Sequence, residues 1–299
     1  MQFRLLELAM NFLSLIYQDH IIDINLTRDH TTSHLLAIKS NPIPDASQYQ
    51  IKMHFSLPYI KRNKLSLFIF EEDWSAALAE IEFHPREAKA WETRPGFFDG
   101  EHESSMLPLH VACARRHTPL NVVRAIVETY PEALSTKETA FKRLPLHVAC
   151  QFGEGPDVIN YLVRENRSSV LEPDSLGRLP IHYACSNGSE PAVIKILLEA
   201  NPASALYADY NGWLPIHVAL NFGASTTAIK ELIDACPASV AVRTTKGSTT
   251  VSLAHKLSTK NKEEVLRLLT DAVESGRCEG KHVSAFGKTR QVLQVSRAA

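Results

Sequence analysis

The chain repeats one seven-residue pattern, Leu-Pro-Leu-His-Val-Ala-Cys, which it first carries at residues 107–113. Close copies begin at Leu144, Leu179 and Leu214, and a degenerate fifth copy begins at Thr250. The histidines of the first four copies are 37, 35 and 35 residues apart. A fixed period of this length indicates a solenoid, in which each unit contacts only its neighbours.

Each copy predicts one unit made of a helix, a turn, a second helix and an extended loop. Proline is the second residue of the first four copies and suits the first position of a helix. A second helix is expected to open near residues 119, 156, 191 and 226, with the hydroxyls of Thr118 and Ser189 as caps. Within residues 122–127 the apolar positions i, i+1, i+4 and i+5 give one buried stripe. We therefore predict an all-α repeat solenoid of stacked helix-turn-helix units, joined by extended inter-repeat fingers.

The composition is that of an ordinary soluble protein, with 44% hydrophobic and 22% charged residues. A formal net charge of −1 gives no reason to expect nucleic acid as a partner. No run of about 18 apolar residues predicts a membrane span. Three of the five cysteines share one repeat position, which indicates small core residues in a reducing compartment. We expect the cytoplasm, with the nucleus as the alternative.

Three regions are expected: an unclassified, small mixed N-terminal segment (1–70), a repeat domain (71–275) and a disordered basic tail (276–299). Residues 71–88 are interpreted as the second half of a repeat whose first half has been replaced. The apolar spacing over residues 1–17 favours an amphipathic docking helix, with a targeting segment and a gene-boundary artefact as alternatives. Residues 21–26 and 49–57 are expected to form short strands.

Residues 177–184 (Gly-Arg-Leu-Pro-Ile-His-Tyr-Ala) and 212–219 (Gly-Trp-Leu-Pro-Ile-His-Val-Ala) resemble the ankyrin repeat, whose hallmark is Gly-x-Thr-Pro-Leu-His-x-Ala. The resemblance covers about residues 71–275. Leu replaces the hallmark Thr, Lys142 replaces the glycine of the second unit, and the period exceeds the family's value of about 33. The resemblance implies structural histidines, whose imidazoles hydrogen-bond to adjoining backbone and tie neighbouring units: His110, His147, His182 and His217.

The same histidines invite a metal hypothesis, because three of them precede a cysteine by three residues. His and Cys both bind zinc, but one pair per unit leaves each candidate site two ligands short. We therefore predict no metal site, no cofactor and no small-molecule substrate. The chain contains no nucleophile elbow, phosphate loop, His-Glu-x-x-His or dinucleotide fingerprint, so we predict that it is not an enzyme.

The resemblance instead implies a protein-binding surface on the concave face of the array, made by the finger tips and the exposed ends of the first helices. Mapped by position, that surface is rich in aromatic residues and Arg, as interfaces are. Its predicted contact residues are Arg115, Phe141, Arg143, Gln151, Phe152, Leu176, Arg178, Ser186, Asn187, Tyr210, Asn211, Trp213, Asn221, Phe222 and Lys246. For Phe152, Trp213 and Phe222, packing against the next unit is the alternative, and for Trp213 binding is favoured over it.

The sequence thus predicts a monomeric protein-protein interaction module whose partner is not basic. The alternative is an adaptor or regulatory subunit, such as a ubiquitin-ligase or signalling scaffold. In that case the N-terminal segment would provide a second docking site.

Overall fold

A computed structural model describes residues 23–27, 35–39, 63–257 and 262–274. The predictions for residues 1–17, 49–57 and 276–299 lie outside these ranges. The chain divides into two compact units, residues 1–61 with 96–102 and residues 62–95 with 103–299. Each unit is described by itself.

In the first unit, β1 (Asp23–Thr27) pairs with β2 (Leu35–Lys39) in an antiparallel ladder. The register places Asp23 opposite Lys39 and Thr27 opposite Leu35. The strand predicted at residues 21–26 overlaps β1.

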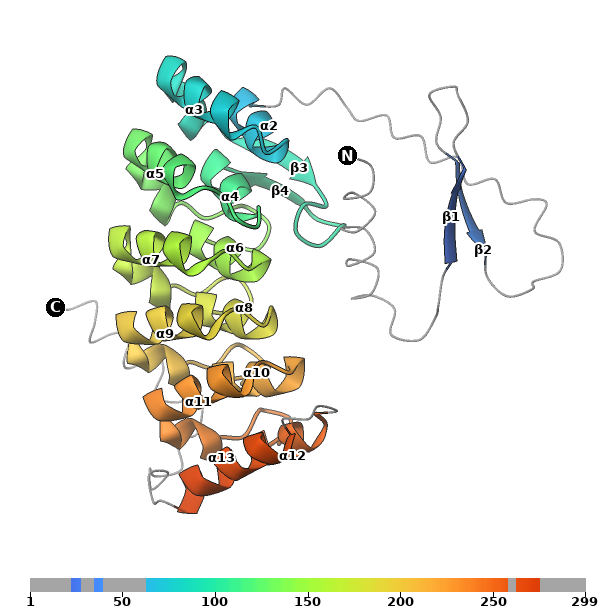
Figure 1. Ribbon diagram of the computed structural model, residues 1–299, viewed down its shortest axis with the longest axis vertical. Coiled ribbons are helices and arrows are strands. Elements are labelled where there is room, and N and C mark those ends of the chain that lie inside the picture. Colours follow the sequence, from blue (N-terminus) through green and yellow to red (C-terminus); the bar gives the residue numbers. More distant parts are fainter. Residues whose placement is uncertain (1–22, 28–34, 40–62, 258–261, 275–299) are drawn as a thin grey trace. The chain divides into compact units, whose positions relative to one another are not determined.

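In the second unit, the described residues form pairs of helices stacked one on the next (Figure 1). The first helix of each pair contacts the first helix of the next pair, and the second helices do the same. The first, inner helices are α2 (Lys64–Phe70), α4 (Pro108–Cys113), α6 (Pro145–Phe152), α8 (Pro180–Ser186), α10 (Pro215–Phe222) and α12 (Thr250–His255). The second, outer helices are α3 (Trp74–Phe83), α5 (Leu120–Thr129), α7 (Pro156–Glu165), α9 (Pro191–Ala200), α11 (Thr226–Ala235) and α13 (Lys262–Glu274). The predicted all-α repeat solenoid is confirmed.

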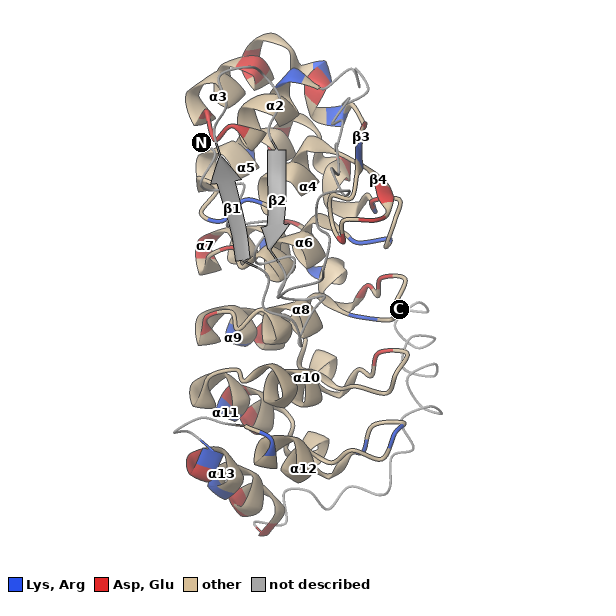
Figure 2. Ribbon diagram, turned by 90° about the vertical axis from the view of Figure 1, so that its right-hand side faces the viewer, with Lys and Arg blue, Asp and Glu red and all other residues tan. Residues whose placement is uncertain are grey.

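Short elements connect the pairs. A 3-10 helix follows the outer helix at η2 (Pro85–Lys89), η3 (Pro131–Ser135), η4 (Arg167–Leu171), η5 (Pro202–Leu206) and η6 (Pro237–Ala241). A hairpin of β3 (Glu92–Pro95) and β4 (Glu103–Met106) precedes α4. The later connections are the four fingers, residues 136–143, 172–178, 207–213 and 242–248, which project from one side of the stack (Figure 2). No described helix reaches the length and apolarity that a membrane crossing requires.

The stack begins earlier than residue 71. Helix α2 packs against both α3 and α4, as an inner helix does, and Leu65 and Ile69 are fully buried. The first half of that repeat is therefore present, although it lacks the motif. Asn63 caps α2 at the position where four other units carry the Leu-Pro entry, because its side-chain oxygen accepts the N–H of Ser66. The motif search missed this helix for that reason.

Proline is the first residue of the inner helices α4, α6, α8 and α10, and it also decides where most outer helices end. Outer helices stop at a residue with φ between −131° and −154°, and in all but one unit a proline follows at once. Proline disfavours helical backbone in the residue before it, which explains the stop. The predicted caps at Thr118 and Ser189 are wrong. The N-cap residues there are Pro119 and Glu190, and the Thr118 hydroxyl instead donates to the carbonyl of Ala112 at 2.7 Å.

The core runs through the stack as one apolar stripe per helix. On α5 the buried residues are Val122, Val123, Ile126 and Val127, as the i, i+1, i+4, i+5 spacing predicts. The thiol positions at residues 113, 150 and 185 are buried and unpaired, in agreement with their prediction as small core residues. Burial at nearly every inner-helix position fixes the spacing between units, so the fingers and helix ends form a preset surface.

Candidate functional site

The four motif histidines connect each inner helix to the next finger. The Nδ1 atom of His147 accepts the backbone N–H of Leu144 at 3.1 Å, and its Nε2 lies 3.1 Å from the carbonyl oxygen of Arg178. His110 and His182 make the same two contacts in their units. His217 reaches the carbonyl of Val242 at 3.1 Å. These are the bonds that the ankyrin resemblance implies.

These contacts leave neither ring nitrogen available to a metal. Burial lowers the pKa of His110, His147 and His182 to about 4, so the rings are neutral at pH 7. Burial also raises the pKa of the Cys113 and Cys150 thiols, and a protonated thiol is a poor ligand. Among the described residues, no group of three or more His, Cys, Asp or Glu could hold a metal ion.

The fingers carry buried carboxylates that fold the loop around themselves. Asp174 accepts the backbone N–H groups of Leu176 and Arg178, both at 2.8 Å, and Asp209 makes the equivalent bonds in the next finger. Glu138 accepts three such N–H groups in the first finger. All three carboxylates are at most 4% exposed. Their charges are therefore used inside the loops and are not presented to solvent.

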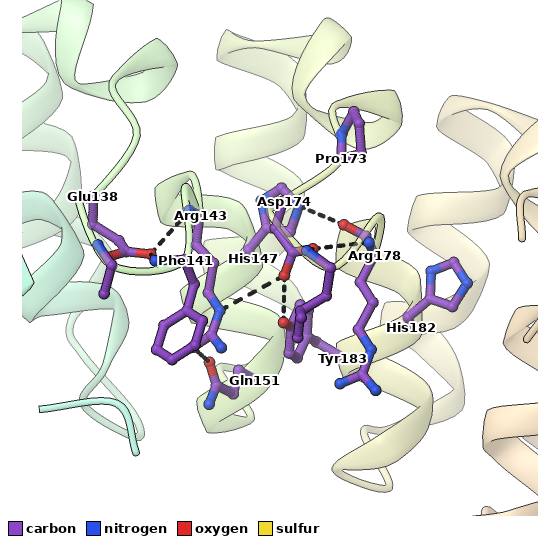
Figure 3. A network of polar contacts seen from close by, with 12 residues as sticks. Glu138, Phe141, Arg143, His147, Gln151, Pro173, Asp174, Arg178, His182 and Tyr183 are labelled. Carbon is purple, nitrogen blue, oxygen red and sulfur yellow. Dashed lines mark hydrogen bonds and ion pairs between the residues drawn. The ribbon is translucent and has the colours of Figure 1, made fainter. Parts of the chain in front are cut away.

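Arg143 ties two consecutive fingers together (Figure 3). Its Nη1 donates to the amide oxygen of Gln151 at 2.7 Å, and its Nε lies 3.8 Å from Oδ2 of Asp174. Its guanidinium lies over the rings of Phe141 and Tyr183, at 4.3 and 5.0 Å from their centroids. The Tyr183 hydroxyl donates to the same Asp174 oxygen at 2.5 Å. This network fixes the spacing of the first two fingers.

The same network corrects one predicted contact residue. Arg143 is only 5% exposed, so it is held within the stack rather than offered to a partner. Its sequence position at a finger tip suggested exposure, but the buried carboxylate of Asp174 and two aromatic rings attract the guanidinium inward. Arg178 repeats the pairing one unit on, with its Nε at 3.4 Å from Asp209, and stays half-buried.

Six of the predicted contact residues are exposed. Tyr210 is 67% exposed, Phe222 is 56% exposed and Leu176 is 40% exposed. The remaining exposed positions are Asn211, Asn221 and Lys246. The half-buried ones are Arg115, Phe141, Gln151, Phe152, Arg178, Ser186, Asn187 and Trp213. The six exposed residues thus lie on the second, third and fourth fingers and at the end of α10.

Three residues illustrate the choice between binding and packing. The ring of Trp213 meets the ring of His217 edge-on, with centroids 6.3 Å apart, and it is half-buried, which favours packing. Arg115 lies over the ring of Phe70 at 4.0 Å, so part of it is used between α4 and α2. Phe222, in contrast, presents most of its surface to solvent. We therefore retain Phe222 among the binding candidates.

Sequence reasoning missed Lys142 as a candidate. It is exposed at the tip of the first finger with φ of +59°, where the other three fingers have Gly177, Gly212 and Gly247 at +73°, +73° and +79°. Only glycine adopts this conformation without cost. The signal was present in the sequence, since Lys142 stands at the glycine position of the motif.

A further buried carboxylate lies at the turn between α6 and α7. Glu154 accepts the N–H of Thr118 at 3.2 Å from the preceding unit, and its second oxygen has no partner among the described residues. Burial raises the pKa of Glu154 to about 7, against the opposing effect of the hydrogen bonds from Thr118. Glu154 therefore titrates near neutral pH.

Comparison with known proteins supports the repeat interpretation. Residues 146–244 match the family model for ankyrin repeats, in three copies. No curated protein matches the chain. The matched residues run from α6 to the fourth finger, and the helix pairs on either side continue the same stack.

Proposed function

This chain carries ankyrin repeats, which generally serve as protein-protein interaction modules, and we propose that it binds a protein partner through its fingers and inner-helix ends. The mechanism is surface complementarity on a preset surface, without catalysis and without a cofactor. Ankyrin domains are typically non-catalytic, which supports this view.

One observation carries the proposal. Within residues 108–241 the exposed large apolar side chains are those of Leu176, Leu206, Tyr210 and Phe222. Three of these four lie on fingers or at the end of an inner helix, whereas the exposed apolar residues of the outer helices, Phe83 on α3 and Val273 on α13, belong to the two terminal helix pairs. Exposed apolar side chains gathered on one face are typical of interaction sites.

The experiment compares the full-length chain with a Tyr210→Ser, Phe222→Ser double variant in affinity capture from a cell lysate. Glu199→Ser on the outer helix α9 is the matched control, because Glu199 is equally solvent-facing. We expect the control to retain captured proteins that the double variant loses. All three proteins should have the same circular dichroism spectrum. Equal capture by all three proteins would rule out this face as the binding site.

A second candidate is an adaptor that recruits another component through its N-terminal segment. The division of the chain favours it, since β1 and β2 belong to a compact unit separate from the stack. Capture by full-length chain and by a chain lacking residues 1–62 tests this. If both recover the same proteins, the adaptor hypothesis fails.

Cys113, Cys150 and Cys185 are buried thiols outside any disulfide, which supports a reducing compartment, the cytoplasm or the nucleus, as the place of action.

A further inference from the structure

We propose, on the basis of the function above, that the finger tips bind a protein segment with an apolar centre and an acidic group at each end. The surface concerned, here called the finger-tip ridge, consists of Lys142, Leu176, Tyr210 and Lys246. These residues come from four consecutive fingers, one from each. The proposal names the chemistry of the partner, which the repeat family alone does not provide.

The finger-tip ridge is continuous because hydrogen bonds join each finger to the next. The N–H of Ser175 donates to the carbonyl of Phe141 at 2.8 Å, and the N–H of Tyr210 donates to the carbonyl of Leu176 at 3.2 Å. The Thr245 hydroxyl completes the series by donating to the carbonyl of Asn211 at 2.6 Å. The four tips therefore present one surface of fixed spacing.

The exposed charge of the fingers is positive. Their acidic residues Glu138, Asp174 and Asp209 are buried, and Glu172, whose side chain is 46% exposed, is paired with Lys137 at 3.2 Å. Outside this pair, the exposed charged residues of the four fingers are all basic: Lys142, Arg243 and Lys246. In Figure 2 the last finger, before α12, is accordingly blue without red. A surface of this sign attracts acidic groups and disfavours basic ones.

The two lysines lie at opposite ends, and the apolar residues lie between them. Tyr210 and Leu176 belong to the two middle fingers and are exposed. The Tyr210 ring lies against Gly177, where a Cβ atom would come within 2.5 Å of its Cδ1. This contact holds the ring in place before binding, which reduces the entropy lost when a partner covers it.

The backbone conformation of Lys142 is the strongest support for a binding role of its positive charge. Its φ of +59° is the conformation that the other fingers give to glycine. A side chain in this conformation costs stability, and such strain concentrates at functional sites. Stability would favour glycine at this position, so the lysine is explained by what its ammonium group binds.

The spacing of the units sets the length of the partner segment. Neighbouring helices pack about 8–10 Å apart, so the three steps from Lys142 to Lys246 span about 24–30 Å. An extended chain advances about 3.3 Å per residue, and its acidic groups would lie about seven to nine residues apart. On the N-terminal side the hairpin carries the exposed Glu103, which repels a longer acidic segment.

The test begins with selection of random peptides of about 12 residues, displayed on phage, against the immobilised full-length chain, a length that covers the span in extended form. We expect enriched peptides to carry Asp or Glu on both sides of apolar residues at the stated separation. Failure to enrich, or enrichment of peptides without this pattern, would overturn the proposal.

The best enriched peptide is then synthesised and titrated by fluorescence anisotropy against variants of the full-length chain. Lys142→Gly and Lys246→Gln should each weaken binding about two- to five-fold, the range for an exposed ion pair. Tyr210→Ser should weaken it at least about tenfold, as loss of a hot-spot aromatic does. Lys195→Gln, which removes an exposed lysine from the outer helix α9, should leave the affinity unchanged.

Two further outcomes separate the partner chemistry from the proposed function. If Tyr210→Ser abolishes capture of a cellular partner while Lys142→Gly and Lys246→Gln do not weaken it, the binding face stands and its acidic ligand is wrong. If Tyr210→Ser has no effect on capture or on the peptide, the face itself is wrong. Displacement of the peptide by a single-stranded oligonucleotide at equal concentration would assign the ridge to nucleic acid and overturn the proposal.

Discussion

The imidazole of His147 bridges two backbone groups, the N–H of Leu144 at 3.1 Å and the carbonyl of Arg178 at 3.1 Å. Because a carbonyl only accepts and an N–H only donates, Nε2 must carry the proton and Nδ1 must be unprotonated. The same neutral tautomer holds for His110 and His182, whose contacts are equivalent. Each ring thus joins an inner helix to the next finger, and a second proton on the ring would break the helix-capping bond.

Replacement of His147 by Ala should lower the free energy of unfolding by about 1–3 kcal/mol, because two buried backbone groups lose their partner. Urea denaturation followed by circular dichroism measures the change. His255→Ala is the matched control, since His255 is exposed on α12 and should change stability by less than about 0.5 kcal/mol. Equal stability of the two variants would contradict the bridging role.

The pKa values of the histidines predict loss of stability in mild acid. Burial lowers the pKa of His110, His147 and His182 to about 4 from the usual 6.5, so the unfolded chain binds more protons between these values. Their contribution to stability is complete above pH 6.5 and is lost as the pH falls through 4. Each histidine contributes at most about 1.4 kcal/mol per pH unit in this window.

Urea midpoints at pH 7, 6 and 5 test this prediction. The midpoint should fall at each step, and it should fall less steeply in the His147→Gln variant, which cannot take up the proton. A midpoint that does not change between pH 7 and 5 would show that the histidines are not held neutral.

Glu154 should act with the opposite sign. Burial raises its pKa to about 7 from the usual 4.5, so the folded chain binds more protons between these values. Its contribution to stability is present below pH 4.5 and is lost as the pH rises through 7. Glu154→Gln keeps the neutral shape at all pH values. The variant should therefore match the wild-type chain near pH 4.5 and exceed it by roughly 1–3 kcal/mol at pH 8.5.

Denaturation at both pH values, with Glu190→Gln as control, provides the check. Glu190 lies near the corresponding turn of the next unit and is exposed, so its replacement should matter little at either pH. A stabilisation by Glu154→Gln that is equal at both pH values would mean that ionisation is not its cause.

The stack was predictable from the sequence because its determinants are local and recur in phase. Proline before the motif histidine starts α4, α6, α8 and α10, and the apolar stripe of residues 122–127 defines one buried face. Helix α2 was not predictable in this way, since Asn63 replaces the motif entry and the helix is recognised only by its packing. The periodicity identifies the units that share the motif, and it does not identify the terminal units that lack it.

The candidate surface was predictable by position and less so by exposure. Tyr210 and Phe222 are exposed as expected, whereas Arg143, at an equally terminal position, is buried. This difference in exposure arises from contacts between units, such as the pairing of Arg143 with Asp174. The sequence of a single finger does not reveal such contacts. Lys142 was not predicted, because its distinguishing feature is a positive φ angle rather than its residue type.

The contrast between Lys142 and Gly177 gives the last prediction. Both residues adopt left-handed backbone, with φ of +59° and +73°, but only the glycine does so without strain. Lys142→Gly should raise the free energy of unfolding by up to about 1 kcal/mol, because relief of about 1–2 kcal/mol of left-handed strain exceeds the extra entropy that glycine loses on folding. Gly177→Ala should lower it by about 1–3 kcal/mol, because the added Cβ is strained and meets the Tyr210 ring at 2.5 Å.

Urea denaturation of the two variants decides whether the lysine is retained against stability. A more stable Lys142→Gly variant that binds the selected acidic peptide less well would show that stability and binding make opposite demands at this position. Lys142→Ala distinguishes strain from charge, since it removes the ammonium group and keeps the side-chain strain. It should lose binding without gaining stability. If Lys142→Gly is instead less stable than the wild-type chain, the lysine contributes to the fold and its conformation requires no functional explanation.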